Sequence, residues 1–215
     1  MKESEVVMSK LVHLAVYDTL ADWEVGYAVA NINTPAWHDG GYEVVTVAET
    51  LEPVTTMGGL TIQPAQALAE LDPSVSQMLI LPGASTWDTG GNRPFAAMAR
   101  RFLDAGVPVA AICGGTFGLA AEGLLDVRAH TSSAPEYLAA SGYAGAARYR
   151  DDPAVTDGDL VTAGPASPVE FARHIFARLG LMPPQVLAAW SALFSTGDAR
   201  YFSELVAARA AGAPA

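Results

Sequence analysis

The sequence predicts an α/β protein in which a mostly parallel sheet is packed between layers of helices. Four short, nearly continuous apolar runs, each followed by a polar or glycine-containing turn, are typical of strands buried on both faces of a sheet. These runs are residues 11–17, 42–48, 77–83 and 107–113. Segments with helical periodicity lie between them, at residues 22–32, 94–105 and 116–122. Because strands that alternate with such helices form right-handed crossover units, we expect the strands to run parallel.

The rest of the chain predicts further elements around this sheet. The expected elements are a hairpin at the sheet edge in residues 52–64, a short strand with a loop in 128–133, two strands joined by an Asp-Gly turn in 154–164, and a helix in 167–180. Pro168 suits the first turn of that helix and Gly180 its end. After residue 183 the pattern indicates two helices divided at 195–197. We expect one domain over residues 1–215, with 183–215 as a C-terminal helical extension.

The amino-acid composition and net charge limit which partners and which cellular location are expected. The 215 residues are 51% hydrophobic, which is ample for a sizeable core. A net charge of −11, with only 12 Lys and Arg, argues against a nucleic-acid partner, which would need a basic face. A single cysteine forms no internal disulfide, and the acidic start "MKESEVVMSK" and the short apolar run after it lack the pattern of a signal peptide or membrane span. We therefore expect a cytoplasmic protein with no nucleic-acid or membrane partner.

Three predicted strand ends carry chemically suggestive residues. In open α/β sheets, ligands bind outside the carboxyl ends of the strands. The first strand is followed by "DTLADWE", the third by "GAS" and the fourth by "CGG". Parallel strands place these three ends at the same edge of the sheet, so the sequence predicts a site there for a small-molecule substrate.

Cys113, the only cysteine, has two interpretations. A strand that turns directly into a helix through Cys-Gly-Gly has the pattern of a nucleophile elbow, and the positive end of the helix would favour thiolate. The backbone N–H of Gly114, with that of Gly83 or Ala84, would then hold a developing oxyanion. The alternative is that Cys113 is a small buried hydrophobic residue.

The acids and the histidines have structural alternatives as well. Asp22 precedes a helical pattern and is expected to cap that helix. Glu24 is either a surface glutamate of the first turn or a buried proton partner of the thiol, and burial beside a negative group would raise its pKa. His130, at a predicted strand end, is either a general base or a structural residue.

No metal or cofactor is expected from the pattern of residues. The other three histidines are interpreted as a packed strand residue, a solvated loop residue and a surface helix residue: His13, His38 and His174. None of them shows metal-ligand spacing with Cys113.

Four segments in order resemble the DJ/PfpI (ThiJ/PfpI) superfamily, whose members are relatives of class I glutamine amidotransferase domains. The segments are "ADWE", "LILPGA", "PVAAICGGTFGLAAEGLL" and "TAGPASPVEFA", within residues 10–180. The chain is most similar to a subgroup described as glutamine-amidotransferase-like. The resemblance implies a flavodoxin-like sandwich, a homodimer, an elbow cysteine at Cys113 bonded to the acid Glu24, backbone oxyanion donors at Gly83 and Gly114, and His130 near the cysteine.

Two departures from the family pattern limit the reaction. Peptidase-like members place a histidine directly after the elbow cysteine, where this chain has Gly114. Glutamine amidotransferases carry a His-x-Glu pair on a late loop, where this chain reads "GPASPVE". Protease and glutaminase activities are therefore not expected.

Three functions follow as hypotheses. In the first, a hydrolase- or lyase-type enzyme uses Cys113 to attack a small electrophile, such as a reactive carbonyl, an isonitrile or an amide, with Glu24 as proton partner. In the second, oxidation of Cys113 acts as a redox or stress signal without catalysis. In the third, the protein is a binding module with an inert thiol. Trp23, Trp87 and Tyr137 are expected to line the pocket.

Overall fold

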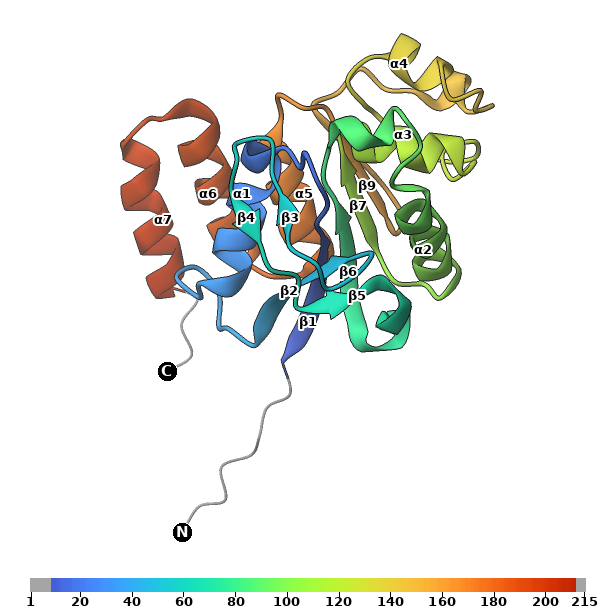
Figure 1. Ribbon diagram of the computed structural model, residues 1–215. Coiled ribbons are helices and arrows are strands. Elements are labelled where there is room, and N and C mark those ends of the chain that lie inside the picture. Colours follow the sequence, from blue (N-terminus) through green and yellow to red (C-terminus); the bar gives the residue numbers. More distant parts are fainter. Residues whose placement is uncertain (1–8, 212–215) are drawn as a thin grey trace.

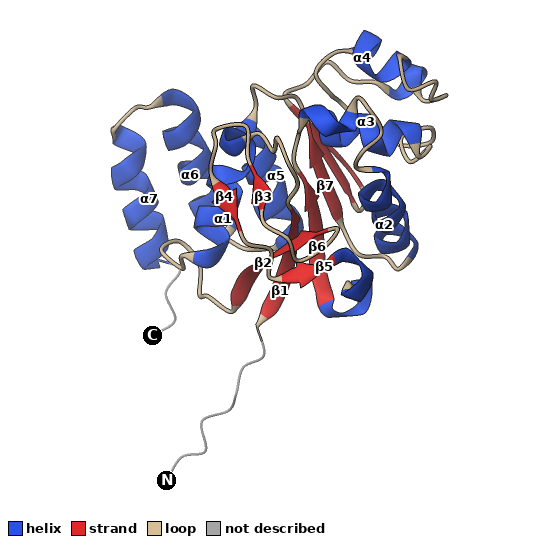
Figure 2. Ribbon diagram, viewed as in Figure 1, coloured by secondary structure: helices blue, strands red, loops and turns tan. Residues whose placement is uncertain are grey.

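The computed structural model describes residues 9–211 and has a seven-stranded sheet between layers of helices (Figures 1 and 2). Six strands run parallel, and the last is antiparallel to its neighbour. In spatial order the strands are β5 (Gln66–Ala67), β2 (Tyr42–Ala48), β1 (Lys10–Ala15), β6 (Ser76–Leu81), β7 (Val109–Ile112), β9 (Leu160–Ala163) and β8 (Ala154–Asp157). The four predicted apolar runs are therefore confirmed as neighbouring or near-neighbouring parallel strands.

Helices cover both faces of this sheet (Figure 2). On one face lie α1 (Asp22–Asn33) and α5 (Pro168–Leu179), and on the other lie α2 (Arg93–Asp104) and α3 (Gly114–Ala121). Beyond α5 stand α6 (Pro184–Thr196) and α7 (Arg200–Ala211), and a short α4 (Pro135–Ala139) packs on α3 (Figure 1). The α/β sandwich predicted from the alternation of strands and helices is thus confirmed.

The central strands are apolar because both of their faces are covered. Every residue of β7 is completely buried, as are residues 78–81 of β6. Each covering helix contributes one apolar stripe, such as Phe95, Ala99 and Phe102 of α2. The hydrophobic effect of this burial fixes the sheet, and the sheet fixes where its strand ends lie.

The strand order places a crevice at the carboxyl end of β1. The chain leaves β1 toward β2 on one side and later returns as β6 on the other side. Such a reversal of strand order is where ligands bind in doubly wound sheets. The segments that follow β1, β6 and β7 therefore meet at one edge, as the sequence predicts.

The predicted hairpin forms a sheet of its own rather than an edge of the main sheet. Its strands are β3 (Val54–Thr55) and β4 (Thr61–Ile62), which pair only with each other. Backbone hydrogen bonds attach the hairpin to the loop after β1, from Thr19 N to Thr55 O at 2.8 Å and from Met57 N to Leu20 O at 2.8 Å. The hairpin turn is thereby brought beside the edge that carries the site.

Two local expectations were wrong. Residues 128–133 form no strand, and only His130 makes an isolated bridge, with Tyr149. His38 is buried rather than solvated, because its ring bonds to Asn31 O at 2.9 Å and accepts from Gly40 N at 3.0 Å. The expected strands of residues 154–164 and the helix that ends at Gly180 are both present.

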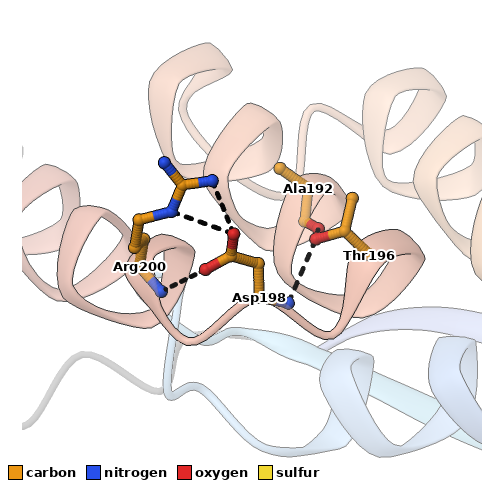
Figure 3. A network of polar contacts seen from close by, with 4 residues as sticks. All are labelled: Ala192, Thr196, Asp198 and Arg200. Atoms are coloured by element: carbon orange, nitrogen blue, oxygen red, sulfur yellow. Dashed lines mark hydrogen bonds and ion pairs between the residues drawn. The ribbon is translucent and has the colours of Figure 1, made fainter.

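Two C-terminal helices are present as predicted, and a polar network stabilises the turn between them. Figure 3 shows Asp198 accepting hydrogen bonds from the backbone and the guanidinium of Arg200. Thr196 bonds back to Ala192 O at 2.6 Å and accepts from Asp198 N at 3.2 Å. Gly197 between them adopts a left-handed conformation, with φ of 68°. Within residues 9–211, no helix has the length and apolar character needed to cross a membrane.

Candidate active site

Cys113 occupies a sharp turn between β7 and α3. Its φ of 55° and ψ of −122° lie in a region that residues with a side chain rarely adopt. The turn is held from both sides: the Cys113 N–H donates to Ala163 O at 3.1 Å, and the hydroxyl of Thr116 donates to Cys113 O at 2.6 Å. The predicted elbow geometry is therefore present, with a thiol that is half-buried at its tip.

The glycines after Cys113 are required by close packing. A Cβ on Gly115 would overlap the backbone oxygen of Leu81, and a Cβ on Gly118 would overlap the indole of Trp87. Trp87 is itself fixed by hydrogen bonds from its Nε1 to Pro82 O and Tyr17 Oη. Helix α3 approaches β6 this closely only because these positions lack a side chain.

Glu24 extends from the first turn of α1 into the interior and is completely buried. Its Oε2 accepts a hydrogen bond of 2.6 Å from the N–H of Gly83, two residues after the end of β6. A Cβ on Gly83 would lie 2.8 Å from Glu24 Oε2 and 2.8 Å from Cys113 Cβ, so the two side chains meet at this glycine. Glu24 Oε1 is buried without a hydrogen-bond partner. Of the two interpretations of Glu24, the structure supports the buried one.

Burial raises the pKa of both Glu24 and Cys113. Burial raises the pKa of Glu24 to about 7, against the hydrogen bond from Gly83 that favours the carboxylate. Burial, followed by the charge of Glu24, raises the pKa of Cys113 to about 12. The hydrogen bond from Gly114 N–H lowers the pKa of the thiol but does not offset these effects. The helix end therefore favours thiolate, as expected, but burial and the charge of Glu24 outweigh its effect.

The two groups hold one proton between them over a wide range of pH. Their titrations belong to the pair, because each charge raises the pKa of the other group. Above pH of about 7, the pair loses its first proton and carries one negative charge, on the carboxylate in the resting state. A thiolate then forms only when the Cys113 proton moves to Glu24.

Of the three N–H groups predicted to bind an oxyanion, one is already bonded to Glu24 and two lie beside the thiol. The Gly83 N–H is already bonded to Glu24, so it positions the acid instead of binding substrate. The N–H of Ala84 has no acceptor among residues 9–211, and the N–H of Gly114 is directed at the Cys113 sulfur. A Cβ on Gly114 would lie 3.2 Å from Ala84 N, so Gly114 and Ala84 are neighbours at the site.

Asp22 was expected to cap α1, but it does not. The cap position is Ala21, and Asp22 is the first helical residue. Its Oδ2 accepts a hydrogen bond of 2.6 Å from Gly58 N in the hairpin turn. Hydrogen bonding to Thr56, with that from Gly58, holds the pKa of Asp22 below its ordinary value. Asp22 therefore anchors the hairpin beside the site.

His130 lies outside the site. Its Nδ1 bonds to Arg128 O at 2.8 Å, its Nε2 bonds to Tyr143 Oη at 3.2 Å, and its ring packs edge-on against Tyr143 and Tyr149. Burial lowers the pKa of His130. Both ring nitrogens are occupied by structural partners, which favours the structural interpretation over that of a general base.

A cavity of about 300 Å³ opens onto the thiol. Its lining is Ala21, Trp23, Glu24, Met57, Gly83, Ala84, Ser85, Asp88, Cys113, Gly114, Ser133 and Tyr137. Trp23 and Tyr137 line the cavity as predicted, whereas Trp87 lies under the elbow and lines a neighbouring cavity. The described residues contain no group of three or more His, Cys, Asp and Glu side chains close enough to hold a metal ion.

Three lining residues were not anticipated from the sequence. Ser133 Oγ lies 4.0 Å from Cys113 Sγ, Met57 comes from the tip of the hairpin, and Asp88 Oδ1 accepts a hydrogen bond of 2.7 Å from Tyr137 Oη. All three lie on loops or short turns whose paths depend on tertiary contacts. No local sequence pattern marks them.

Comparison with known proteins identifies the relatives of this chain. The model of the DJ-1/PfpI family matches residues 10–178. A Bacillus subtilis (strain 168) protein named "Uncharacterized protease YoaZ" is 37% identical over 205 residues, which cover 93% of this chain and 98% of that protein.

Solved structures agree with this result. A thiJ/pfpI family protein from Bacillus anthracis is 36% identical with a TM-score of 0.88, and the match covers 94% of this chain and 97% of that one. A DJ-1 superfamily protein from Agrobacterium tumefaciens is 34% identical with a TM-score of 0.80, covering 88% and 100% of the two chains. The chain therefore belongs to the DJ-1/PfpI family and has the α/β three-layer fold of its solved members.

Proposed function

We propose that the protein is an enzyme that uses Cys113 to attack the electrophilic carbon of a small substrate, with Glu24 as its proton acceptor and donor. The observation that carries this proposal is the completely buried carboxyl of Glu24, which the Gly83 N–H holds against the Cys113 thiol. Burying an ionisable group costs free energy, and a fold retains such a group most readily where it serves chemistry. Its pKa of about 7 suits proton transfer near neutral pH.

The first chemical step follows from these positions. For a reactive carbonyl, the thiol proton moves to Glu24 while a sulfur lone pair forms the bond to the carbonyl carbon. The π electrons of the C=O bond move to the oxygen, where the N–H groups of Ala84 and Gly114 stabilise the negative charge. Glu24 then returns the proton to that oxygen, which leaves a neutral adduct on Cys113. Isonitriles and amides are the other two substrate classes of the proposal.

The cavity favours small substrates over polypeptides. A volume of about 300 Å³ is at the lower end of small-molecule sites. Although the relatives are named as proteases, position 114 in this chain has no room for a catalytic histidine: even a Cβ there would lie 2.9 Å from Trp87 and 3.1 Å from Ala84 O. We therefore propose hydrolase- or lyase-type chemistry on a small molecule and not peptide hydrolysis.

Oxidation of Cys113 is the second candidate function. The hydroxyl of Ser133 and the N–H of Gly114 lie beside the sulfur and would donate hydrogen bonds to sulfinate oxygens. Reaction with peroxide needs thiolate, however, and the raised pKa of Cys113 opposes it. Intact-mass analysis after mild peroxide distinguishes the two: selective gain of two oxygens on Cys113 supports oxidation, and its absence supports the enzyme.

The homodimer implied by the family and the cytoplasmic location stay predictions. Light scattering coupled to size-exclusion chromatography tests the first, and a mass of about 22.4 kDa would contradict it. Cell fractionation tests the second.

The central experiment measures Cys113 alkylation by iodoacetamide against pH in the wild type and in Glu24→Gln. In the wild type, the rate should rise through pH of about 7, where the pair loses its first proton, and then level off. In Glu24→Gln, the rate should follow that of the wild type up to pH of about 7 and then keep rising instead of levelling off, because the neutral glutamine neither exchanges a proton with the thiol nor raises the pKa of Cys113 by its charge. Identical profiles would contradict the role of Glu24.

A turnover assay tests the role of Cys113. Cys113→Ala should abolish turnover across a panel of small carbonyls, isonitriles and amides on which the wild type is active. Full turnover by this variant would refute the proposal.

A further inference from the structure

The charged residues that line the cavity over Cys113 are all acidic. Two of its lining residues are acidic, Glu24 and Asp88, and none is Lys, Arg or His. The remaining walls are largely apolar or aromatic, with Trp23, Met57 and Tyr137 as the large side chains. An anion entering this cavity meets negative charge without a compensating cation, in surroundings where water screens charges less than it does in bulk solution.

Asp88 is an exposed residue at the rim of this cavity, and a hydrogen bond orients its carboxylate. Its Oδ1 accepts the 2.7 Å hydrogen bond from Tyr137 Oη, and the Tyr137 ring packs on Phe117 with ring centroids 5.2 Å apart. Burial and the bond to Asp88 raise the pKa of Tyr137, so its hydroxyl remains a donor. Asp88 forms no ion pair with any residue in 9–211, and its second oxygen has no hydrogen-bond partner among them.

A second cavity, of about 330 Å³, adjoins the first at Asp88. Both cavities include Asp88 in their lining, and the second continues over Trp87, Phe117 and Gly118. The basic residue in the lining of this second cavity is Arg93. Its exposed side chain forms no ion pair with an acidic residue of the described chain. Asp88 therefore lies where the two cavities meet, with one oxygen free to accept a hydrogen bond from a ligand.

We propose that Asp88 determines specificity by accepting a positively charged or hydrogen-bond-donating group of the substrate, such as an amine, amide or hydroxyl, while the electrophilic carbon lies at Cys113. Carboxylate-bearing electrophiles are excluded from the site by Asp88 and Glu24. This inference rests on the proposed function and names the substrate class for it. Glu24, which is buried beneath the thiol, acts on the proton, whereas Asp88 acts on the charge of the incoming molecule.

The test compares three methanethiosulfonate reagents that carry a positive aminoethyl group, a neutral methyl group or a negative sulfonatoethyl group. Each forms a mixed disulfide with Cys113, which intact mass quantifies, and each rate is divided by its rate with 2-mercaptoethanol. The wild type should react fastest with the cation and slowest with the anion. In Asp88→Asn, which keeps an oxygen for Tyr137, the cation-to-anion ratio should fall about three- to tenfold, as expected for one charge at several ångströms in a partly screened site.

Two control variants separate the local charge from other effects. Asp104→Asn removes the same charge from another exposed position, at the end of α2, and should change the ratio less than about twofold because Asp104 does not line the cavity over Cys113. Tyr137→Phe removes the hydrogen bond but keeps the Asp88 charge, and should leave the wild-type preference for the cation.

The outcomes distinguish this inference from the proposed function. An unchanged ratio in Asp88→Asn, or an equal fall in Asp104→Asn, overturns the role of Asp88 while leaving catalysis by Cys113 intact. A parallel change in all three rates means that Asp88 controls access and not charge, which also overturns it. If Cys113 reacts with none of the reagents, the proposed nucleophile itself is refuted.

Discussion

The substitution Glu24→Gln should stabilise the protein above neutral pH although it removes the proposed catalytic acid. The folded protein raises the pKa of Glu24 from 4.5 to about 7, which means that folding disfavours the carboxylate. An acid with a raised pKa binds its proton in the folded state while the unfolded state has already released it. The free energy of unfolding of the wild type therefore falls as pH rises from about 4.5 to about 7, and it is level above that.

The size of the effect follows from the pKa difference. At about 1.4 kcal/mol per pKa unit, the difference between 4.5 and about 7 corresponds to a loss of up to about 3 kcal/mol at pH 8. Glutamine has nearly the shape of glutamate, and its oxygen still accepts from the Gly83 N–H. Glu24→Gln removes the ionisation and should regain most of this free energy at pH 8, but almost none at pH 4.5.

Urea unfolding at half-unit intervals between pH 4.5 and pH 8.5 measures this difference. The thiol of the unfolded chain begins to ionise at about pH 8.5 in both proteins alike, so it does not contribute to the difference between them. An exposed control, Glu43→Gln in β2, reports the effect of removing one negative charge from the acidic chain. A Glu24→Gln variant that is no more stable than the wild type at pH 8 would refute the reasoning. So would a difference that does not shrink toward pH 4.5.

Two further predictions concern the elbow itself. Gly118→Ala in α3 should destabilise the fold by about 1–3 kcal/mol, because its methyl group overlaps the buried Trp87, whereas Gly26→Ala in α1 meets nothing within 4 Å and should stabilise it by about 0.5–1 kcal/mol. Urea midpoints that shift in the same direction for both variants would contradict the packing argument. Cys113→Gly should be more stable than Cys113→Ala by about 1 kcal/mol, because glycine adopts the backbone conformation of this turn without strain. Thermal unfolding of the two variants checks this, and a more stable alanine variant would show that the turn is unstrained.

The strand ends were predictable because a short rule connects pattern to position. Continuous apolar runs indicate buried parallel strands, and parallel strands place their carboxyl ends together. The sequence pattern therefore predicts that Glu24, Gly83 and Cys113 lie at one edge of the sheet, and in the structure these residues are in contact. The Cys-Gly-Gly turn was readable for a similar reason, since few local geometries require small residues at that junction.

The protonation of the site was not predictable in this way. From local sequence, the end of α3 stabilises a thiolate, but the burial of Cys113 and the charge of Glu24 outweigh that effect. The Gly83 N–H, expected to bind substrate, binds Glu24 instead. Both outcomes depend on how deeply groups far apart in the chain are buried together, and no local pattern reports burial depth.

The sequence pattern was sufficient to predict a parallel sheet and the functional group that follows each strand: an acid after the first strand, a glycine after the third and a thiol after the fourth. Local periodicity and backbone sterics suffice for that much. Only the tertiary structure decided that Asp22 anchors the hairpin, that His130 is bound elsewhere, and that Asp88 faces the thiol cavity. Which side chains on different loops contact each other depends on how distant segments pack together. The free energy of that packing is a sum over many contacts, and no short stretch of the chain encodes it.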